Sequence, residues 1–478
     1  MVMSFDEYGD YDGLGLAELV ARREVSAADL VEAAIERIEK LDPTLNAVVH
    51  RAFESARSEA ASDLPDGPFR GVPFLIKDLG CPVGGMPRTS GSRFMASEVP
   101  KQDGILTRRY RKAGVVILGK TNTPEFGITG TTESAQLGPC RNPWNPDHIS
   151  GGSSGGSAAA TASGMVPLAH ASDGLGSIRI PAACCGLVGL KTTRDRNPSG
   201  MEDADRILGF SVDHVVSRTV RDSAAMLDWT GQPEPGCPYA IPAKERPYLE
   251  EIERDAGRLR IAFSAITPSG RPIDPEIESA LHETAKQLED LGHDVFEATI
   301  DVDWRQLYAA QAVVSSASAA ANLSRMIERV GREPREEELE ALTWAGIRHG
   351  RKQDGVSVMQ AWGTMRLLTR KIVAAYDDFD VFLTPVLGTD PPKVGHIDPV
   401  GLAPREVGKR QSRIFPFTPP CNFTGQPAIS LPLAWSEAGL PIGMQFAARY
   451  ADEATLFRLA AQLEQARPWI GRRPAVWV

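Results

Sequence analysis

Ser177 stands at the end of a glycine-rich turn that could carry nucleophilic chemistry. The apolar segment 165–169 runs towards the turn Asp173–Ser177, with sequence DGLGS, and a small-residue stretch follows. This order is typical of a strand, a tight turn and the start of a helix. Such a turn presents consecutive backbone N–H groups on one side, which suits the oxyanion of a tetrahedral intermediate. A hydroxyl at its end is well placed to attack a carbonyl held there.

A second candidate is Ser153, in the run SGGSSGGSAAA at 150–160. Its glycines allow backbone conformations closed to other residues, and the run leads into a segment that we expect to be helical. The residues alone leave three other interpretations open: a flexible linker, a phosphate-binding loop, and the G-x-S-x-G elbow of α/β-hydrolases, centred on Ser153 or Ser154. The phosphate loop would need a Gly-Lys-Ser/Thr ending, which is missing. The elbow would need a strand before it and a histidine partner after it. The preceding residues, NPWNPDHIS, are turn-like. The histidines after Ser177 have no suggestive setting: His214, His282, His293, His349 and His396.

The third candidate is Lys77, which directly follows an apolar run in GVPFLIKD. Burial lowers the pKa of a lysine because desolvation disfavours the ammonium form, and a neutral lysine can act as a general base. The alternative is a lysine at a strand end that pairs with its neighbour Asp78.

These residues need a layered scaffold to bring them together. Apolar periodicity and capping residues predict four helices. The first begins after Ser26 and ends before Pro43. The others cover 105–113, 275–291 with Asp274 as cap, and 453–466. Short apolar runs predict strands at 72–76, 115–118, 259–264, 295–296, 381–387 and 428–433. Alternating helices and buried strands indicate an α/β fold. No convincing linker is present, so we expect one domain over 1–478. The mostly helical region 305–375 could form a cap over one side of the site.

Bulk composition narrows the class of protein. The chain has 478 residues, is 42% hydrophobic and carries a formal net charge of −10, which argues against nucleic-acid or anionic-membrane partners. No apolar run approaches the ~18 residues of a membrane span, and the acidic N-terminus lacks the features of a secretory signal. The six cysteines form no CxxC pair, so we expect reduced, mostly buried thiols and a cytoplasmic protein.

Taken together, the three candidates resemble the amidase-signature family. That family has a lysine at a strand end, a GGSSGG loop, and a D-x-x-G-S-I-R turn whose serine lies 24 residues after the loop serine, as here (177 − 153 = 24). Further matching motifs are GKTNTPEFG (119–127), RNPWNP (141–146), GLVGLK (186–191), DHVVSRTVRDSA (213–224), NFTGQPAISLPL (422–433) and GLPIGMQ (439–445). The resemblance covers most of the chain, and the joint match is highly specific.

The resemblance implies a fold and a set of roles. The fold would be a central mixed β-sheet covered by helices on both faces, with the signature core at about 71–200. Ser177 would be the nucleophile, Ser153 the bridging serine and Lys77 the base, and neither metal nor cofactor would be required. The oxyanion would be bound by the backbone N–H groups of Gly174, Leu175, Gly176 and Ser177. The reactants would be a small-molecule amide and water, and relatives are commonly homodimers.

Three supporting roles also follow from the resemblance. Asp173 and Arg179 would brace the nucleophile turn, and Ser154 would support hydrogen bonding near the base. The segment that lies near the substrate in relatives carries Phe126, Gly127 and Ile128, and the apolar Ile128 favours an apolar acyl or aryl group.

One departure from the family pattern concerns Leu175, where many members have glycine. The backbone N–H survives this change, while the added side chain could narrow or steer the acyl pocket. Members that act on nylon-type amide oligomers, cyclic ones included, also lack this glycine, and we expect this chain to resemble them. The alternative inside the family is the glutamine-hydrolysing subunit of a tRNA-dependent amidotransferase. Outside it, the alternative is a binding module that kept the fold without the chemistry.

Overall fold

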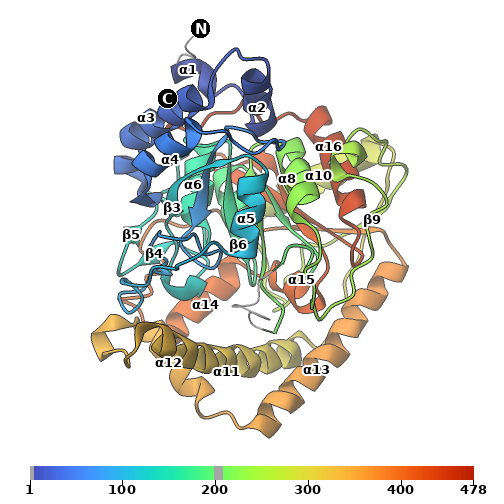
Figure 1. The fold of residues 1–478 in the computed structure, drawn as a ribbon. Helices are drawn as coiled ribbons and strands as arrows, with labels where there is room; N and C mark the ends of the chain where they lie inside the picture. The colour runs from blue at the N-terminus through green and yellow to red at the C-terminus, as the bar shows by residue number, and fades with distance from the viewer. Residues whose placement is uncertain (1–4, 199–207, 478) are drawn as a thin grey trace.

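The computed structural model describes residues 5–198 and 208–477, and a single large sheet organises them (Figure 1). The sheet has 11 strands in the order β1-β3-β2-β6-β8-β7-β12-β13-β11-β9-β10. The pairs β2–β3, β2–β6, β9–β10 and β9–β11 are parallel and the others antiparallel, so the predicted mixed sheet is confirmed. The strands are β1 Val48–Arg51, β2 Pro73–Lys77, β3 Val116–Thr121, β6 Leu168–Asp173, β7 Val188–Lys191, β8 Val212–Ser217, β9 Arg260–Phe263, β10 Asp294–Glu297, β11 Val381–Pro385, β12 Ala428–Trp435 and β13 Pro441–Ala448. A separate two-stranded ribbon pairs β4 Glu133–Ser134 with β5 Gly138–Pro139.

Helices cover both faces of this sheet. Every residue of β2, β3, β6, β8 and β13 is buried, and because side chains alternate between faces, both faces of these strands must be covered. The helices are α1 Phe5–Tyr8, α2 Gly13–Ala21, α3 Ala27–Leu45, α4 Phe53–Ala60, α5 Ile105–Lys112, α6 Gly155–Ala162, α7 Arg179–Cys185, α8 Val220–Thr230, α9 Tyr248–Glu251, α10 Pro275–Asp290, α11 Trp304–Val330, α12 Ala341–Gly350, α13 Gly355–Ala374, α14 Pro404–Ile414, α15 Pro419–Thr424 and α16 Glu453–Ala466. No helix among the described residues is long and apolar enough to span a membrane.

The predicted helix ends are close to the observed ones, with one informative difference at Pro43. Ser26 caps α3 through a reciprocal pair of bonds with Asp29, as its sequence suggests. The helix does not stop before Pro43 but runs through it to Leu45 and ends at Asn46, which is left-handed. Proline removes only one intrahelical hydrogen bond this close to the end, so the last turn survives.

Four strands of the main sheet, β1, β7, β8 and β13, were not predicted. Two of them, β7 and β13, contain glycine, which weakens a strand signal. Gly189 of β7 and Gly443 of β13 face helix α7, where an added Cβ would lie 2.5 Å from the Ala182 side chain and 2.4 Å from that of Ala183. The glycines therefore allow α7 to approach the sheet closely. Helix α7 begins two residues after Ser177, so this packing fixes the element that directly follows the glycine-rich turn.

The expected helical region consists of α11, α12 and α13. Figure 1 shows these helices, in yellow and orange, as a layer along one side of the sheet-containing body. Helix α11 packs against both α12 and α13, and α13 reaches the body at α15. The apolar contacts of this helical layer form clusters separate from the main core. One cluster includes Leu307 and Val314 of α11 and Met365 and Leu368 of α13.

Candidate active site

Lys77 lies at the carboxyl end of β2, inside the sheet. Its neighbours β3 and β6 run parallel to β2, and the side chain is fully buried. Its Nζ lies 2.7 Å from Ser153 Oγ, 2.8 Å from Ser154 Oγ and 3.0 Å from Ser172 Oγ. The lysine is thus surrounded by three hydroxyl groups from two other segments. The carboxylate of Asp78, the neighbour considered as an alternative partner, accepts from the N–H and the hydroxyl of Thr89.

The Gly/Ser run forms a buried, ordered loop. Every residue from 150 to 160 is buried, the Gly152–Ser153 peptide bond is cis, and helix α6 begins at Gly155. An added Cβ on Gly152 would lie 2.5 Å from the Thr131 carbonyl oxygen, so only glycine fits there. The linker interpretation is therefore wrong. The elbow interpretation also fails, because residues 141–152 contain no strand.

Ser154 connects the lysine to strand β6. Its Oγ donates to the Ser172 carbonyl oxygen and accepts from the Ser172 N–H, both at 3.2 Å. This is the supporting role that the family resemblance implied. Ser172 itself was missed. The signal was available, because His170 and Ser172 are polar residues at alternate positions of a buried strand and so share one face.

The turn that ends in Ser177 starts from the same cluster. Strand β6 delivers Ser172 to the lysine and ends at Asp173, and α7 begins at Arg179. Ser177 is partly exposed, whereas Lys77 and Ser153 are buried. A reagent arriving from solvent therefore meets the Ser177 end of this constellation first.

One expectation about the turn needs correction. The Gly176 N–H donates to Asp173 Oδ1 at 2.7 Å, so it is already engaged inside the protein. Among residues 5–198 and 208–477, no hydrogen bond uses the N–H groups of Gly174, Leu175 or Ser177. The set of four expected donors is thus reduced to three. The sequence could not reveal this, because it depends on how the Asp173 carboxylate folds back over its own turn.

Asp173 and Arg179 form a buried ion pair under the turn. The Arg179 guanidinium donates to both carboxylate oxygens at 2.9 Å, and neither side chain is exposed. Burial by itself raises the pKa of the Asp173 carboxyl, but the charge and hydrogen bonds of Arg179 outweigh burial and hold that pKa well below its ordinary value. Arg179 also donates to the Thr418 carbonyl at 2.8 Å and to the side chains of Gln445 and Asn422 at 2.6 Å. The ion pair thus ties the turn that ends in Ser177 to α15 and to strand β13.

The three substrate-lining candidates face different surroundings. An added Cβ on Gly127 would lie 3.0 Å from Ser153 Oγ, so this residue lies directly beside the bridging serine. Phe126, with a left-handed φ of 49°, packs on an apolar cluster from α11, α12 and the 94–95 segment. Ile128 is 42% exposed, so of the three it is the one that faces solvent.

Leu175 also turns towards the helical layer. Its side chain packs on the cluster of α11 and α13 residues that includes Leu307 and Met365. Leu175 and Phe126 thus each pack on an apolar cluster that contains side chains of the helical layer. Among the described residues no group of three or more His, Cys, Asp and Glu side chains could hold a metal ion.

Comparison with known proteins agrees with this geometry. The family model described as Amidase matches residues 29–457. The 6-aminohexanoate-cyclic-dimer hydrolase of Paenarthrobacter ureafaciens is 37% identical over 477 residues, which cover 97% of this chain and 96% of that protein. A solved structure of 6-aminohexanoate cyclic dimer hydrolase complexed with substrate superimposes with a TM-score of 0.93 over 98% of this chain and 99% of that chain.

The chain belongs to the amidase-signature family and is a hydrolase that acts on the carbon–nitrogen bonds of amides. The expected similarity to members acting on nylon-type oligomers is confirmed. The amidotransferase alternative is more distant: the matching chain of the glutamyl-tRNA(Gln) amidotransferase of Thermotoga maritima is 25% identical, with a TM-score of 0.77 over 100% of this chain and 98% of that chain.

Proposed function

We propose that the protein cleaves an amide through an acyl-enzyme on Ser177, with Ser153 and Lys77 as the proton relay. The observation that carries the proposal is the 2.7 Å contact between Lys77 Nζ and Ser153 Oγ in a buried setting, beside the end of β6 from which the Ser177 turn departs. Neutral Lys77 accepts the Ser153 proton while Ser153 accepts the proton of Ser177. The Ser177 oxygen then attacks the amide carbonyl.

The remaining steps use the same groups in reverse order. The N–H groups of Gly174, Leu175 and Ser177 stabilise the tetrahedral oxyanion, and removal of one such donor typically costs about 2.7–4 kcal/mol. Ser153 returns its proton to the leaving nitrogen, because an amide anion is a very poor leaving group. Water then repeats the attack on the acyl-enzyme, which releases the carboxylic acid and regenerates Ser177.

The substrate we propose is an apolar, aryl or oligomeric amide, linear or cyclic. Two features support this class: Leu175 and Phe126 are apolar and belong to the turn and the segment proposed to line the substrate, and each packs on an apolar cluster that includes side chains of the helical layer. We propose that this layer caps the substrate side of the site within one domain. The name of the relative that hydrolyses 6-aminohexanoate cyclic dimer points to the same chemistry.

Two experiments test this function. A fluorophosphonate probe should label the folded protein at Ser177 and fail to label Ser177→Ala; unlabelled wild type would reject the nucleophile. A hydrolysis screen over aryl anilides, fatty amides, cyclic and linear 6-aminohexanoate oligomers and glutamine should find turnover in the first three classes. Turnover of glutamine alone would favour the amidotransferase alternative.

We further propose a cytoplasmic homodimer. All six cysteines are free thiols, which suits a reducing compartment.

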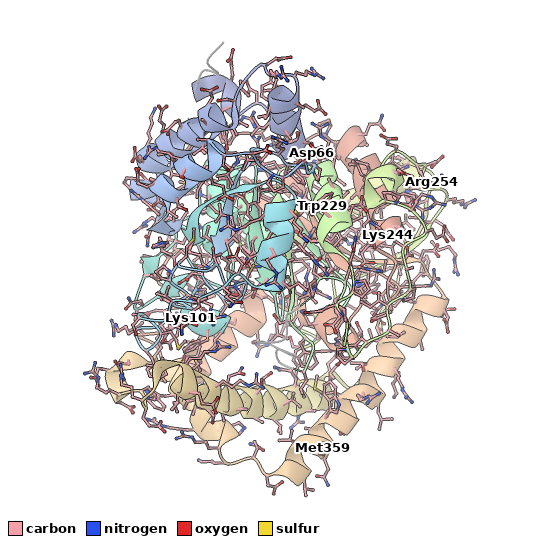
Figure 2. All side chains as sticks on the ribbon, in the orientation of Figure 1. Asp66, Lys101, Trp229, Lys244, Arg254 and Met359 are labelled. Carbon is pink, nitrogen blue, oxygen red and sulfur yellow. The ribbon has the colours of Figure 1, made fainter. Side chains whose placement is uncertain are left out.

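The dimer contact we propose is α13, whose outer face exposes Val356, Met359 and Leu367 by 65–68%. Figure 2 shows Met359 on the far side of this helix from the body. These residues and Gly363 recur at helical spacing, and Met359 and Leu367 lie symmetrically about Gly363.

This symmetry makes the face complementary to a second copy of itself. An antiparallel copy of α13 would set Met359 against Leu367, and the N-terminal Asp354 near the basic Arg370 and Lys371. Sedimentation of Met359→Glu should give a monomer, while Val400→Glu, at another exposed apolar position (57%) outside α13, should match wild type. A dimer that survives Met359→Glu would reject this interface.

A further inference from the structure

Directly behind the lysine lies a buried histidine–aspartate pair that the proposed reaction does not use. His170 Nδ1 lies 3.3 Å from the backbone nitrogen of Lys77, and its Nε2 lies 3.2 Å from Asp213 Oδ1. The side chains of His170 and Asp213 are 0% and 2% exposed. The pair thus joins the catalytic strand β2 to β8 through a side chain of β6.

These contacts fix the proton on the imidazole. A backbone N–H can only donate, so Nδ1 must be the unprotonated acceptor, and the ring proton lies on Nε2 facing the Asp213 carboxylate. Burial lowers the pKa of His170, although Asp213 opposes this effect, so the ring is neutral at ordinary pH. The other groups that face it are Tyr110 from α5, Lys120 from β3, His214 from β8 and the Lys77 side chain.

The contact between His170 and the Lys77 N–H takes the place of a hydrogen bond between strands. Strands β2 and β6 are paired only at Leu75 and Ala169, so regular pairing stops before Lys77. The imidazole takes the Lys77 N–H at the point where a strand carbonyl would normally accept it. The lysine side chain reaches Ser153, Ser154 and Ser172 at this same point.

We infer that His170, held by Asp213, is a positioning residue for Lys77: it anchors the main chain of the base, and Asp213 places a fixed negative charge behind it. The inference rests on the proposed role of Lys77 as the base. Loss of the anchor lets the lysine leave the Ser153 hydroxyl. Loss of the charge disfavours the ammonium form of Lys77, so the neutral base persists to lower pH.

The test is the rate of fluorophosphonate labelling of Ser177 as a function of pH, which needs no natural substrate. The variants are His170→Phe, His170→Asn and Asp213→Asn. Asparagine keeps an acceptor near the Nδ1 position, so it conserves the anchor where phenylalanine does not. The matched control is His214→Asn, a buried histidine on β8 whose ring contacts Ser223.

We expect His170→Phe to label about 10–100-fold more slowly, and His170→Asn only a few-fold more slowly. Asp213→Asn should move the acid limb of the pH profile down by about one pH unit, the order expected for charges a side-chain length apart in a protein interior. His214→Asn should keep the wild-type profile. Melting temperatures of all variants identify any that fail to fold, and His170→Asn, the mildest change, remains informative in that case.

Lys77→Ala, run in parallel, separates two failures. If Lys77→Ala labels at the wild-type rate, the proposed relay is wrong. If Lys77→Ala is inert while the folded His170 and Asp213 variants all match His214→Asn in rate and pH profile, the positioning role alone is overturned.

Discussion

Helices α6 and α11 represent two regions that are built in different ways. All eight residues of α6, which carries the loop of Ser153, are buried. Only five of the 27 residues of α11, in the helical layer, are buried. The first region holds its polar groups by many hydrogen bonds to distant segments. The second is joined to the body by apolar clusters and by hydrogen bonds of Glu125 and Glu340. The difference suggests that reactivity resides in the rigid region and selectivity in the loosely packed one.

The largest expected effect lies in the rigid region. Lys77→Ala should lower kcat/KM at neutral pH by about three orders of magnitude, because the relay loses its base. The far-ultraviolet circular dichroism spectrum should match wild type. Near-wild-type turnover by a folded variant would contradict the assignment of chemistry to this region.

The second prediction concerns the brace under the nucleophile turn. Arg179→Met leaves the Asp173 carboxylate buried without its partner, and breaking such a pair typically costs about 3–5 kcal/mol of unfolding free energy. Urea denaturation at pH 7 measures this loss. The matched control is Lys286→Met, which removes an exposed pair with Asp290 and should leave the urea midpoint nearly unchanged.

The same pair predicts a pH dependence. The pKa of Asp173 is lower in the folded chain than in the unfolded one, so the pair stabilises the fold above the unfolded value of about 3.9. This contribution is lost as the pH falls below that value towards the folded pKa. Asp173→Asn should therefore lose less stability on acidification than wild type; equal losses would show that the carboxylate is not the group responsible.

A smaller effect is expected where the two regions meet. Leu175→Gly removes the side chain that joins the turn to α11 and α13 but keeps the backbone N–H. The preference for long-chain over acetyl anilides, measured as a ratio of kcat/KM values, should fall about 10-fold. Leu175→Met, which keeps an apolar contact, should retain most of the preference. An unchanged ratio in the glycine variant would remove Leu175 from specificity.

The smallest effect concerns the attachment of α12. Glu125 accepts from the Glu340 N–H and from Thr343, and Glu340 in turn accepts from the Ala135 N–H. Burial, with a contribution from Glu125, raises the pKa of Glu340 to about 7. Because the folded pKa exceeds the unfolded value of about 4.3, stability is highest below the unfolded value and falls as the pH rises towards 7.

Glu340→Gln removes this ionisation and keeps an oxygen that can accept from Ala135. Its melting temperature should exceed that of wild type by a few degrees at pH 8 and by nothing at pH 4. A difference that does not vary with pH would mean that the charge of Glu340 is not what weakens the attachment of the layer.

The sequence singled out Lys77, Ser153 and Ser177, the residues of the proposed relay, because local patterns mark each of them. An apolar run ends at Lys77, a glycine loop carries Ser153, and a glycine turn carries Ser177. What it could not reveal depends on contacts between distant segments. The engagement of the Gly176 N–H needs the folded Asp173 carboxylate, and the glycines of β7 and β13 make sense only once α7 lies on them. The outward side chain of Ile128 likewise follows from its surroundings, not from its type.

The partners of Arg179 have a consequence for how the enzyme comes into being. Thr418, Asn422 and Gln445 lie 239, 243 and 266 positions further along the chain. A ribosome that has synthesised all three catalytic residues has therefore not yet made the groups that brace the nucleophile turn. Since synthesis proceeds at about 5–20 residues per second, the nascent chain spends many seconds with its reactive serine unsupported. The contacts that join the Ser177 turn to α15 and β13 can therefore form only near the end of translation.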